Sequence, residues 1–269
     1  MIKVLLFSFT LFLQLSLLAD TLIIAHRGAS KQAPENTLPA FELAWKQGAD
    51  AIEADFRMTK DGHVVCIHDA NTKKTADKNL IIAKSTLSEL KKLDFGLFKG
   101  KQFKGTRIPT IEEVFASIPK GKKIFIEIKS GPETVQPLLK AIKQSSLQPE
   151  QIAIIGFKEK ILLDIKKHAP HIYTSWLCSL KKDKRGKMKP SLESIMKTIK
   201  ACQIDGFSSS YNQLNQEIIQ TLQKQGTDCH VWTINDTRHA KKFVAWKINS
   251  ITTDLPEKIK VVLAQDSKD

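Results

Sequence analysis

Short runs of β-branched and apolar residues alternate along the chain with longer amphipathic segments, and this alternation restricts the possible folds most strongly. Eight runs are predicted strands: Leu22–His26, Ala51–Phe56, Lys123–Lys129, Gln151–Phe157, Tyr173–Cys178, Gly206–Ser210, Cys229–Asn235 and Ser250–Asp254. Helix-like segments separate most of them, among them Thr37–Gln47, Thr134–Ser145, Glu159–His168, Leu192–Ala201 and Asn215–Gln225. Strands that alternate with helices indicate βαβ units and a parallel sheet. Eight such units predict a closed (β/α)8 barrel, the α/β fold called a TIM barrel.

One interval departs from this rhythm. The segment between Phe56 and Lys123 is far longer than a single helix requires. Within it, His63–Asp69 follows an Asp-Gly turn and predicts an additional strand. Residues about 58–110 are otherwise rich in lysine and irregular, and the regular pattern resumes with a predicted helix at Ile111–Ser117. We therefore expect residues about 58–110 to form an insertion on the rim, between the second and third barrel strands.

The first 19 residues differ from the rest of the chain. A short positive start, Met1-Ile2-Lys3, precedes the apolar run Val4–Ala19, which is typical of a secretory signal peptide with cleavage before Asp20. The run is short for a membrane span, which needs about 20 apolar residues. An uncleaved anchor is the alternative. We expect residues 20–269 to form the mature domain of an exported protein, periplasmic or secreted.

Composition restricts the partners and metals. The net charge of +14 favours anionic partners, which include nucleic acid, acidic lipid and phosphorylated metabolites. The basic residues are spread widely, with denser patches at Lys91–Lys104 and Lys181–Lys189, but no aromatic interleaving or nucleic-acid motif accompanies them, so no nucleic-acid partner is expected. The cysteines lack the CxxC spacing of a zinc site, and both disulfides and buried free thiols stay open. They are Cys66, Cys178, Cys202 and Cys229.

Charged residues interrupt two of the predicted strands on one face. Side chains two apart on a strand share a face, so Glu53 lies beside Asp55, and Glu127 beside Lys129. The apolar residues between them should face the helices, which places the charges inside the barrel near the carboxyl ends of its strands, where such enzymes have their active sites. Carboxylates there are costly unless they are paired or bind a cation. Three of them suit a divalent metal. A carboxylate pair for glycoside cleavage and a salt bridge with Arg57 are the alternatives.

Further polar residues follow the strands. The planar guanidinium of Arg27 suits a phosphate clamp, and Lys129 suits a point charge beside phosphate. His26 and His68 can transfer protons near neutral pH. Each of these residues, taken alone, has a structural alternative: His68 could have a purely structural role, and Lys129 could form an ion pair inside the barrel. Other polar residues at strand and helix ends are expected to be structural, as helix caps: Asn36, Thr37 and Asp254.

Together these motifs resemble one family. HRG and PENT, then IEADFRMTKDGHVVCIHD, then FIEIK, VWTIN and ITTDLP are similar to motifs of the glycerophosphodiester phosphodiesterases, from about Leu22 to Pro256. Met58–Thr110 matches the insertion typical of that family. The resemblance implies acid/base roles for His26 and His68. It also implies metal ligands at Glu53, Asp55 and Glu127, phosphate contacts at Arg27 and Lys129, and a pocket-lining aromatic at Trp232.

The activity implied by this resemblance is the hydrolysis of a small anionic glycerophosphodiester to glycerol 3-phosphate and an alcohol. The expected cofactor is a divalent cation, Ca²⁺ or Mg²⁺. The nucleophile could be water or the neighbouring glycerol hydroxyl. The alternatives are a phospholipase acting on lysolipids or phosphoinositides at a membrane, and a binding barrel without turnover. The sequence does not indicate membrane contact, and its one docking candidate is the insertion, with Phe95, Leu97, Phe98 and Phe103.

Overall fold

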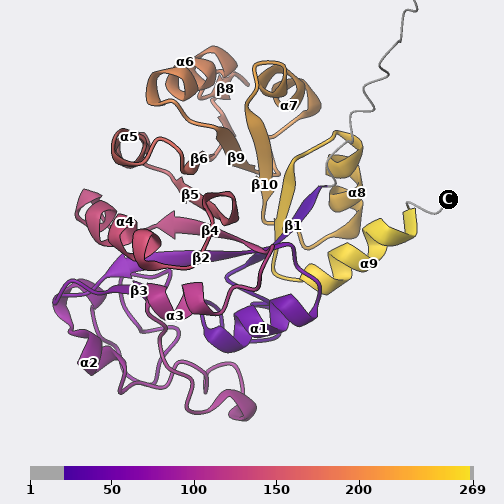
Figure 1. The fold of residues 1–269 in the computed structure, drawn as a ribbon. Coiled ribbons are helices and arrows are strands. Elements are labelled where there is room, and N and C mark those ends of the chain that lie inside the picture. Colours follow the sequence, from indigo (N-terminus) through magenta and orange to yellow (C-terminus); the bar gives the residue numbers. More distant parts are fainter. Residues whose placement is uncertain (1–20, 267–269) are drawn as a thin grey trace, which may run out of the picture.

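The computed structural model describes residues 21–266, and eight parallel strands in it close into a barrel. The predicted signal peptide lies outside the described residues and stays a prediction. The barrel closes because β1 pairs with β2 on one side and with β11 on the other, as in the register pairs Ala25↔Ile52 and Ala25↔Thr253. The predicted TIM barrel is confirmed (Figure 1). Its strands are β1 (Leu22–His26), β2 (Ala51–Met58), β4 (Lys123–Ile128), β5 (Ile152–Gly156), β6 (Tyr173–Cys178), β9 (Gly206–Ser210), β10 (Asp228–Trp232) and β11 (Ser250–Thr253).

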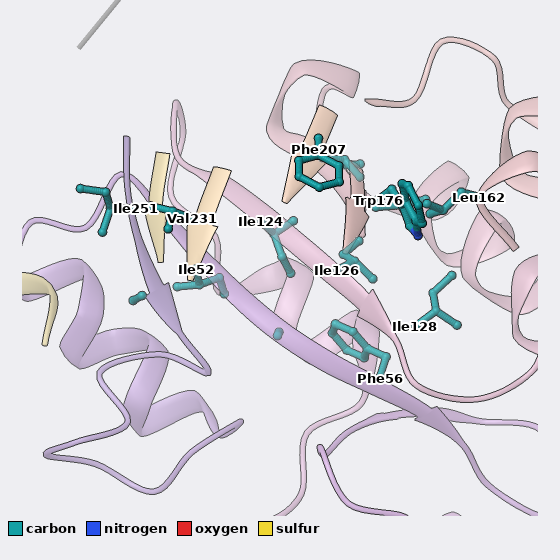
Figure 2. Close-up of a cluster of buried hydrophobic side chains, with 14 of the residues drawn as sticks. Ile52, Phe56, Ile124, Ile126, Ile128, Leu162, Trp176, Phe207, Val231 and Ile251 are labelled. Atoms are coloured by element: carbon teal, nitrogen blue, oxygen red, sulfur yellow. The ribbon is translucent and has the colours of Figure 1, made fainter. Parts of the chain in front are cut away.

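Helices cover the outer wall of the barrel (Figure 1). The main core lies between the helices and the strands, because alternate residues of each strand point outward. In β4 these are Ile124, Ile126 and Ile128, which are buried in the same apolar cluster as Trp176 and Phe207 (Figure 2). Each such side chain contributes about 1.5–3 kcal/mol when fully buried. The helices are α1 (Leu38–Lys46), α3 (Ile111–Ala116), α4 (Val135–Gln144), α5 (Glu159–His168), α6 (Leu192–Cys202), α7 (Gln216–Gln223), α8 (Thr237–Ala245) and α9 (Pro256–Asp266).

The barrel interior contains a smaller apolar cluster and a hydrogen-bonded polar group formed by His230, Ser250 and Tyr173. His230 is buried there, and its Nδ1 and Nε2 atoms lie 2.8 Å from the Ser250 hydroxyl and 2.8 Å from the Tyr173 hydroxyl. Burial lowers the pKa of His230 to about 4, so the ring is neutral near pH 7. His230 lines both the site described next and a second cavity, which is bordered by Leu22, Lys123 and Asp228. The apolar cluster comprises Ile24, Ala51, Phe125, Ala153, Ile155 and Leu177.

The insertion is more ordered than the sequence indicated. Its first element, β3 (Val64–Cys66), pairs antiparallel with β2, as predicted for an extra strand. Beyond it lie the 3-10 turns Ile82–Lys84 and Lys101–Phe103 and the short helix α2 (Leu87–Leu90). These pack around a second core to which the predicted strand contributes Val65 and Ile67. Its other apolar residues follow no helical or strand period, so the pattern did not reveal the core. That core comprises Val65, Ile67, Ile82, Leu90, Leu93, Phe95 and Ile108.

Three further findings complete the fold. The basic patch after β6 forms a hairpin of β7 (Lys181–Lys182) and β8 (Met188–Lys189), which the sequence did not predict. All four cysteines are free thiols, and Cys66, Cys178 and Cys229 are buried, so the thiol alternative is correct. In residues 21–266 no helix combines the length and the apolar character required to span a bilayer.

Candidate active site

Three neighbouring strands bring the predicted polar residues together at one end of the barrel. His26 ends β1 and stands in register with Glu53 of β2. On the other side of β2, Asp55 stands in register with Glu127 of β4. Because the strands are parallel, these residues occupy the same carboxyl end, as predicted for a barrel active site.

The three carboxylates form a compact buried cluster. Oxygens of Glu53, Asp55 and Glu127 lie within 4.8 Å of one another. The residues are only 3%, 1% and 9% exposed, respectively. The Oε1 atom of Glu53 is buried and has no hydrogen-bond partner. Such an unsatisfied anionic oxygen among other carboxylates is the arrangement expected of a cation site.

Burial and mutual repulsion change the acidity of the cluster. Burial, followed by the charges of Asp55 and Glu127, raises the pKa of Glu53 well above its usual value. Burial and the charge of Asp55 also raise the pKa of Glu127, although Lys129 opposes the rise. A divalent cation would offset both burial and this repulsion, and three buried carboxylates are a donor set that fits one.

Two basic side chains border the cluster. The backbone N–H of Arg27 donates to Glu53 Oε2 at 3.0 Å, and its guanidinium donates to Glu35 Oε1 at 2.8 Å. The Arg27 Nε atom lies 3.2 Å from Asp55 Oδ2. Lys129 Nζ donates to Glu127 Oε1 at 2.7 Å and lies 3.6 Å from Asp55 Oδ1. The cluster of three carboxylates therefore lies against two cationic side chains, an arrangement able to bind both a cation and a phosphate.

Asn36 orients Asp55. Its Nδ2 donates to Asp55 Oδ2 at 2.8 Å, and its Oδ1 accepts the Asp55 backbone N–H at 3.1 Å. The expected capping role of Asn36 and Thr37 was wrong, because Thr37 makes no side-chain cap and donates its hydroxyl to Pro34 O instead. Arg27 and Asn36 both have left-handed backbones, at φ 56° and 58°. Strained backbone of this kind is concentrated at functional sites.

Each histidine has a carboxylate at Nδ1. His26 Nδ1 lies 2.7 Å from Asp254 Oδ1, and His68 Nδ1 lies 2.8 Å from Asp69 Oδ1. Burial lowers the pKa of His68, although Asp55 and Asp69 oppose the shift. With Nδ1 occupied, Nε2 is the atom of each ring left for proton transfer, and both rings line one pocket.

Asp254 was expected to be only a helix cap, and the structure corrects that expectation. Besides His26, it accepts hydrogen bonds from Asn235 Nδ2 at 2.7 Å and from Ser30 Oγ at 3.1 Å. Burial acts to raise the pKa of Asp254, but hydrogen bonds from His26, Asn235 and Ser30 outweigh it and lower the pKa to about 2. Asp254 is thus an anion that orients His26.

The pocket has a polar wall and an apolar wall. Seven of the eight predicted site residues line it, and the eighth, Asp55, is buried behind them. On the apolar wall the rings of Phe157 and Trp232 pack edge to face, with their centroids 6.0 Å apart. Lys129 Nζ lies 5.9 Å from the centroid of the Phe157 ring. Sequence reasoning did not select Phe157, although its place at the end of the predicted strand Gln151–Phe157 was the available signal. The Nε1 of Trp232 is buried without a partner and can donate to a ligand.

Comparisons with known proteins agree with this geometry. Residues 26–258 match the model of the Glycerophosphoryl diester phosphodiesterase family. A glycerophosphodiester phosphodiesterase of Caldanaerobacter subterraneus is 38% identical over 88% of this chain and 95% of its own length. Another, from Bacillus subtilis, is 30% identical over 88% of this chain and 84% of its own length.

Solved structures give the same result. A phosphodiesterase of Oleispira antarctica, in complex with the product sn-glycerol-3-phosphate, has a TM-score of 0.83 at 27% identity and covers 90% of this chain and 96% of its own. A glycerophosphodiester phosphodiesterase of Thermotoga maritima has a TM-score of 0.74 at 28% identity and covers 90% of this chain and 98% of its own. The chain belongs to the glycerophosphoryl diester phosphodiesterase family and is a phosphoric diester hydrolase.

Proposed function

We propose that the chain hydrolyses glycerophosphodiesters to glycerol 3-phosphate and an alcohol, using a divalent cation and two histidines. The observation that carries this proposal is a cluster of three carboxylates at one pocket, lined also by two histidine rings whose Nδ1 atoms are occupied by carboxylates. The Oleispira relative holds sn-glycerol-3-phosphate, which supports a ligand of this class.

Glu53, Asp55 and Glu127 would hold the cation. Carboxylate oxygens are the ligands preferred by Ca²⁺ and Mg²⁺, and the unpartnered Oε1 of Glu53 supports the assignment. When bound, a divalent cation polarises a phosphoryl oxygen and orients the diester. Asn36 holds Asp55 in place through two hydrogen bonds, which keeps its second oxygen turned toward the cluster.

Arg27 and Lys129 would bind the phosphate. Both are already tied to carboxylates, so their cationic groups are positioned before substrate arrives. In the transition state negative charge increases on the phosphoryl oxygens, and fixed cations stabilise that increase. Phe157 and Trp232 would contact the apolar parts of the substrate.

His26 and His68 would move the protons. One ring accepts a proton at Nε2 from the attacking hydroxyl as the new P–O bond forms, and the other donates a proton to the leaving alcohol oxygen as its P–O bond breaks. Asp254 and Asp69 hold the Nδ1 atoms, which leaves Nε2 of one ring to accept the proton and Nε2 of the other, protonated ring to donate it. The hydroxyl belongs either to water or to the glycerol, and the second route passes through a cyclic phosphate.

The test is product formation from glycerophosphocholine and glycerophosphoethanolamine. Glycerol 3-phosphate should appear with Ca²⁺ or Mg²⁺ and disappear when a chelator is added. His26→Ala and His68→Ala should each lower kcat by about 10²–10⁴-fold. No product with any cation would contradict the proposed reaction, and near wild-type turnover in both variants would contradict the proposed role of the histidines.

A further inference from the structure

The segment Asp94–Thr106, here called the 94–106 loop, is a closed loop of fixed shape within the insertion. Its ends are joined by the Phe95 N–H, which donates to Thr106 O at 2.8 Å. The Asp94 carboxylate accepts the backbone N–H groups of Gly96, Leu97 and Gly105 at 2.8, 2.9 and 2.6 Å. The loop also folds tightly on itself, since a Cβ at Gly96 would come within 1.8 Å of the Phe103 carbonyl oxygen.

This loop exposes two adjacent apolar side chains. Leu97 and Phe98 are 45% and 46% exposed, whereas Phe95, three residues before Phe98, is 3% exposed and packs in the core of the insertion. The two are among the five most exposed large apolar residues of residues 21–266. A hydrogen-bonded loop that buries one aromatic ring and exposes the next two apolar side chains presents a small apolar tip to its surroundings.

The apolar tip is flanked by lysines and lies beside the active site. Lys101 and Lys104 are exposed in the same loop. Lys99 Nζ donates to Ser30 O at 2.6 Å, which ties the loop to the segment that follows His26 and Arg27. Lys99 therefore ties the loop to the carboxyl end of the barrel, beside Ser30.

A second basic element extends from the same end of the barrel. The β7–β8 hairpin follows the carboxyl end of β6, and its six basic residues are all exposed. Its one acidic residue is Asp183, which stabilises the turn: its Oδ1 accepts hydrogen bonds from the backbone N–H groups of Arg185 and Lys187, both at 2.9 Å. The six are Lys181, Lys182, Lys184, Arg185, Lys187 and Lys189.

We propose that this end of the barrel docks on an anionic lipid bilayer, with Leu97 and Phe98 entering the interface and the lysines of the loop and hairpin contacting lipid head groups. Apolar side chains beside basic ones are the combination that anionic membrane surfaces bind. The net charge of +14 adds long-range attraction. A soluble polyanion would use the hairpin but would leave the apolar tip in water, so a bilayer explains both elements.

The test is vesicle binding by a chain that begins at Asp20. All barrel strands and their covering helices lie between Leu22 and Asp266, so this chain contains the complete fold. It should sediment with vesicles of phosphatidylcholine that contain phosphatidylglycerol, and much less with phosphatidylcholine alone. The double variant Leu97→Ser, Phe98→Ser should lower the partition coefficient by about tenfold or more. The triple variant Lys184→Ser, Arg185→Ser, Lys187→Ser should also lower it.

Val261→Ser provides the matched control. Val261 is 50% exposed, on helix α9 of the outer wall, and its replacement should leave vesicle binding unchanged. Hydrolysis of soluble glycerophosphocholine should be unaffected in the Leu97, Phe98 double variant, which verifies its fold. Wild-type vesicle binding by that variant would overturn the proposal. The proposal would also be overturned if only the hairpin variant lost vesicle binding, because the hairpin would then act as a site for polyanions in general.

Discussion

At the scale of single residues, the two histidines differ in how far along the chain their carboxylates lie. Asp69 is adjacent to His68, whereas Asp254 is 228 residues from His26. Asp254→Asn preserves the shape of the side chain but removes its charge, so a protonated His26 loses its counter-ion. We expect kcat for glycerophosphocholine to fall by about tenfold or more, with KM little changed.

The stability of this variant has a defined pH dependence. The pKa of Asp254 is lowered to about 2 in the folded protein, so the carboxylate stabilises the fold above its unfolded pKa of about 3.9. That stabilisation is lost as the pH falls through the folded pKa. Urea unfolding should show Asp254→Asn less stable than wild type at pH 7, and the difference should shrink below about pH 4. An equal difference at all pH values would contradict this account.

The residues that carry charge on strands were predictable, and their orienting partners were not. Glu53, Asp55 and Glu127 were recognised because the two-residue period of a strand places them on one face. Asn36 was taken as a helix cap because its position before a helix fits that role, although it binds Asp55 across 19 residues of sequence. Asp254 was missed for the same reason, since its hydrogen bonds join segments that only the closed barrel brings together.

At the scale of secondary-structure elements, the connection from β1 to α1 depends on close packing. Gly28 has φ 80°, and a Cβ there would lie 2.6 Å from the backbone of Ala40. Gly28→Ala should therefore lower the free energy of unfolding by about 2 kcal/mol or more, from backbone strain and steric overlap together. Urea denaturation measures the loss.

Gly62 is the matched control for that experiment. Its φ of 83° is similar, but no atom lies within 4 Å of the position of a Cβ. Gly62→Ala should therefore show the conformational cost alone, about 1 kcal/mol. Equal losses in the two variants would mean that contact with Ala40 does not determine the path of the connection.

Elements with a regular period were predicted, and those without one were not. The strand Tyr173–Cys178 and the helix Glu159–His168 agree with the predicted bounds residue for residue. The insertion has a core whose members, such as Ile82 and Phe95, come from turns and short helices. Their burial depends on where the chain folds back, which no local pattern encodes.

At the scale of the whole molecule, export is the first prediction. The apolar segment before Asp20 is expected to be a signal peptide, and β1 begins at Leu22. Cleavage after Ala19 would leave the whole barrel intact. Expression with a secretion system, followed by N-terminal sequencing of the exported protein, should give Asp20 as the first residue. An intact N-terminus on a membrane-bound product would support the uncleaved anchor instead.

The cation should also stabilise the whole barrel. Glu53 and Asp55 come from β2 and Glu127 from β4, so the cluster links neighbouring strands that must both be in place for binding. A ligand bound only by the folded state adds about 2.7 kcal/mol at a concentration 100 times its dissociation constant. Ca²⁺ or Mg²⁺ should therefore raise the melting temperature of the metal-free protein, in the absence of substrate.

Glu53→Gln should remove most of this increase in melting temperature, because the amide binds the cation less strongly and the remaining carboxylates repel each other less. Val261→Ser should retain it. An equal increase in Glu53→Gln and wild type would place the stabilising cation elsewhere on the protein.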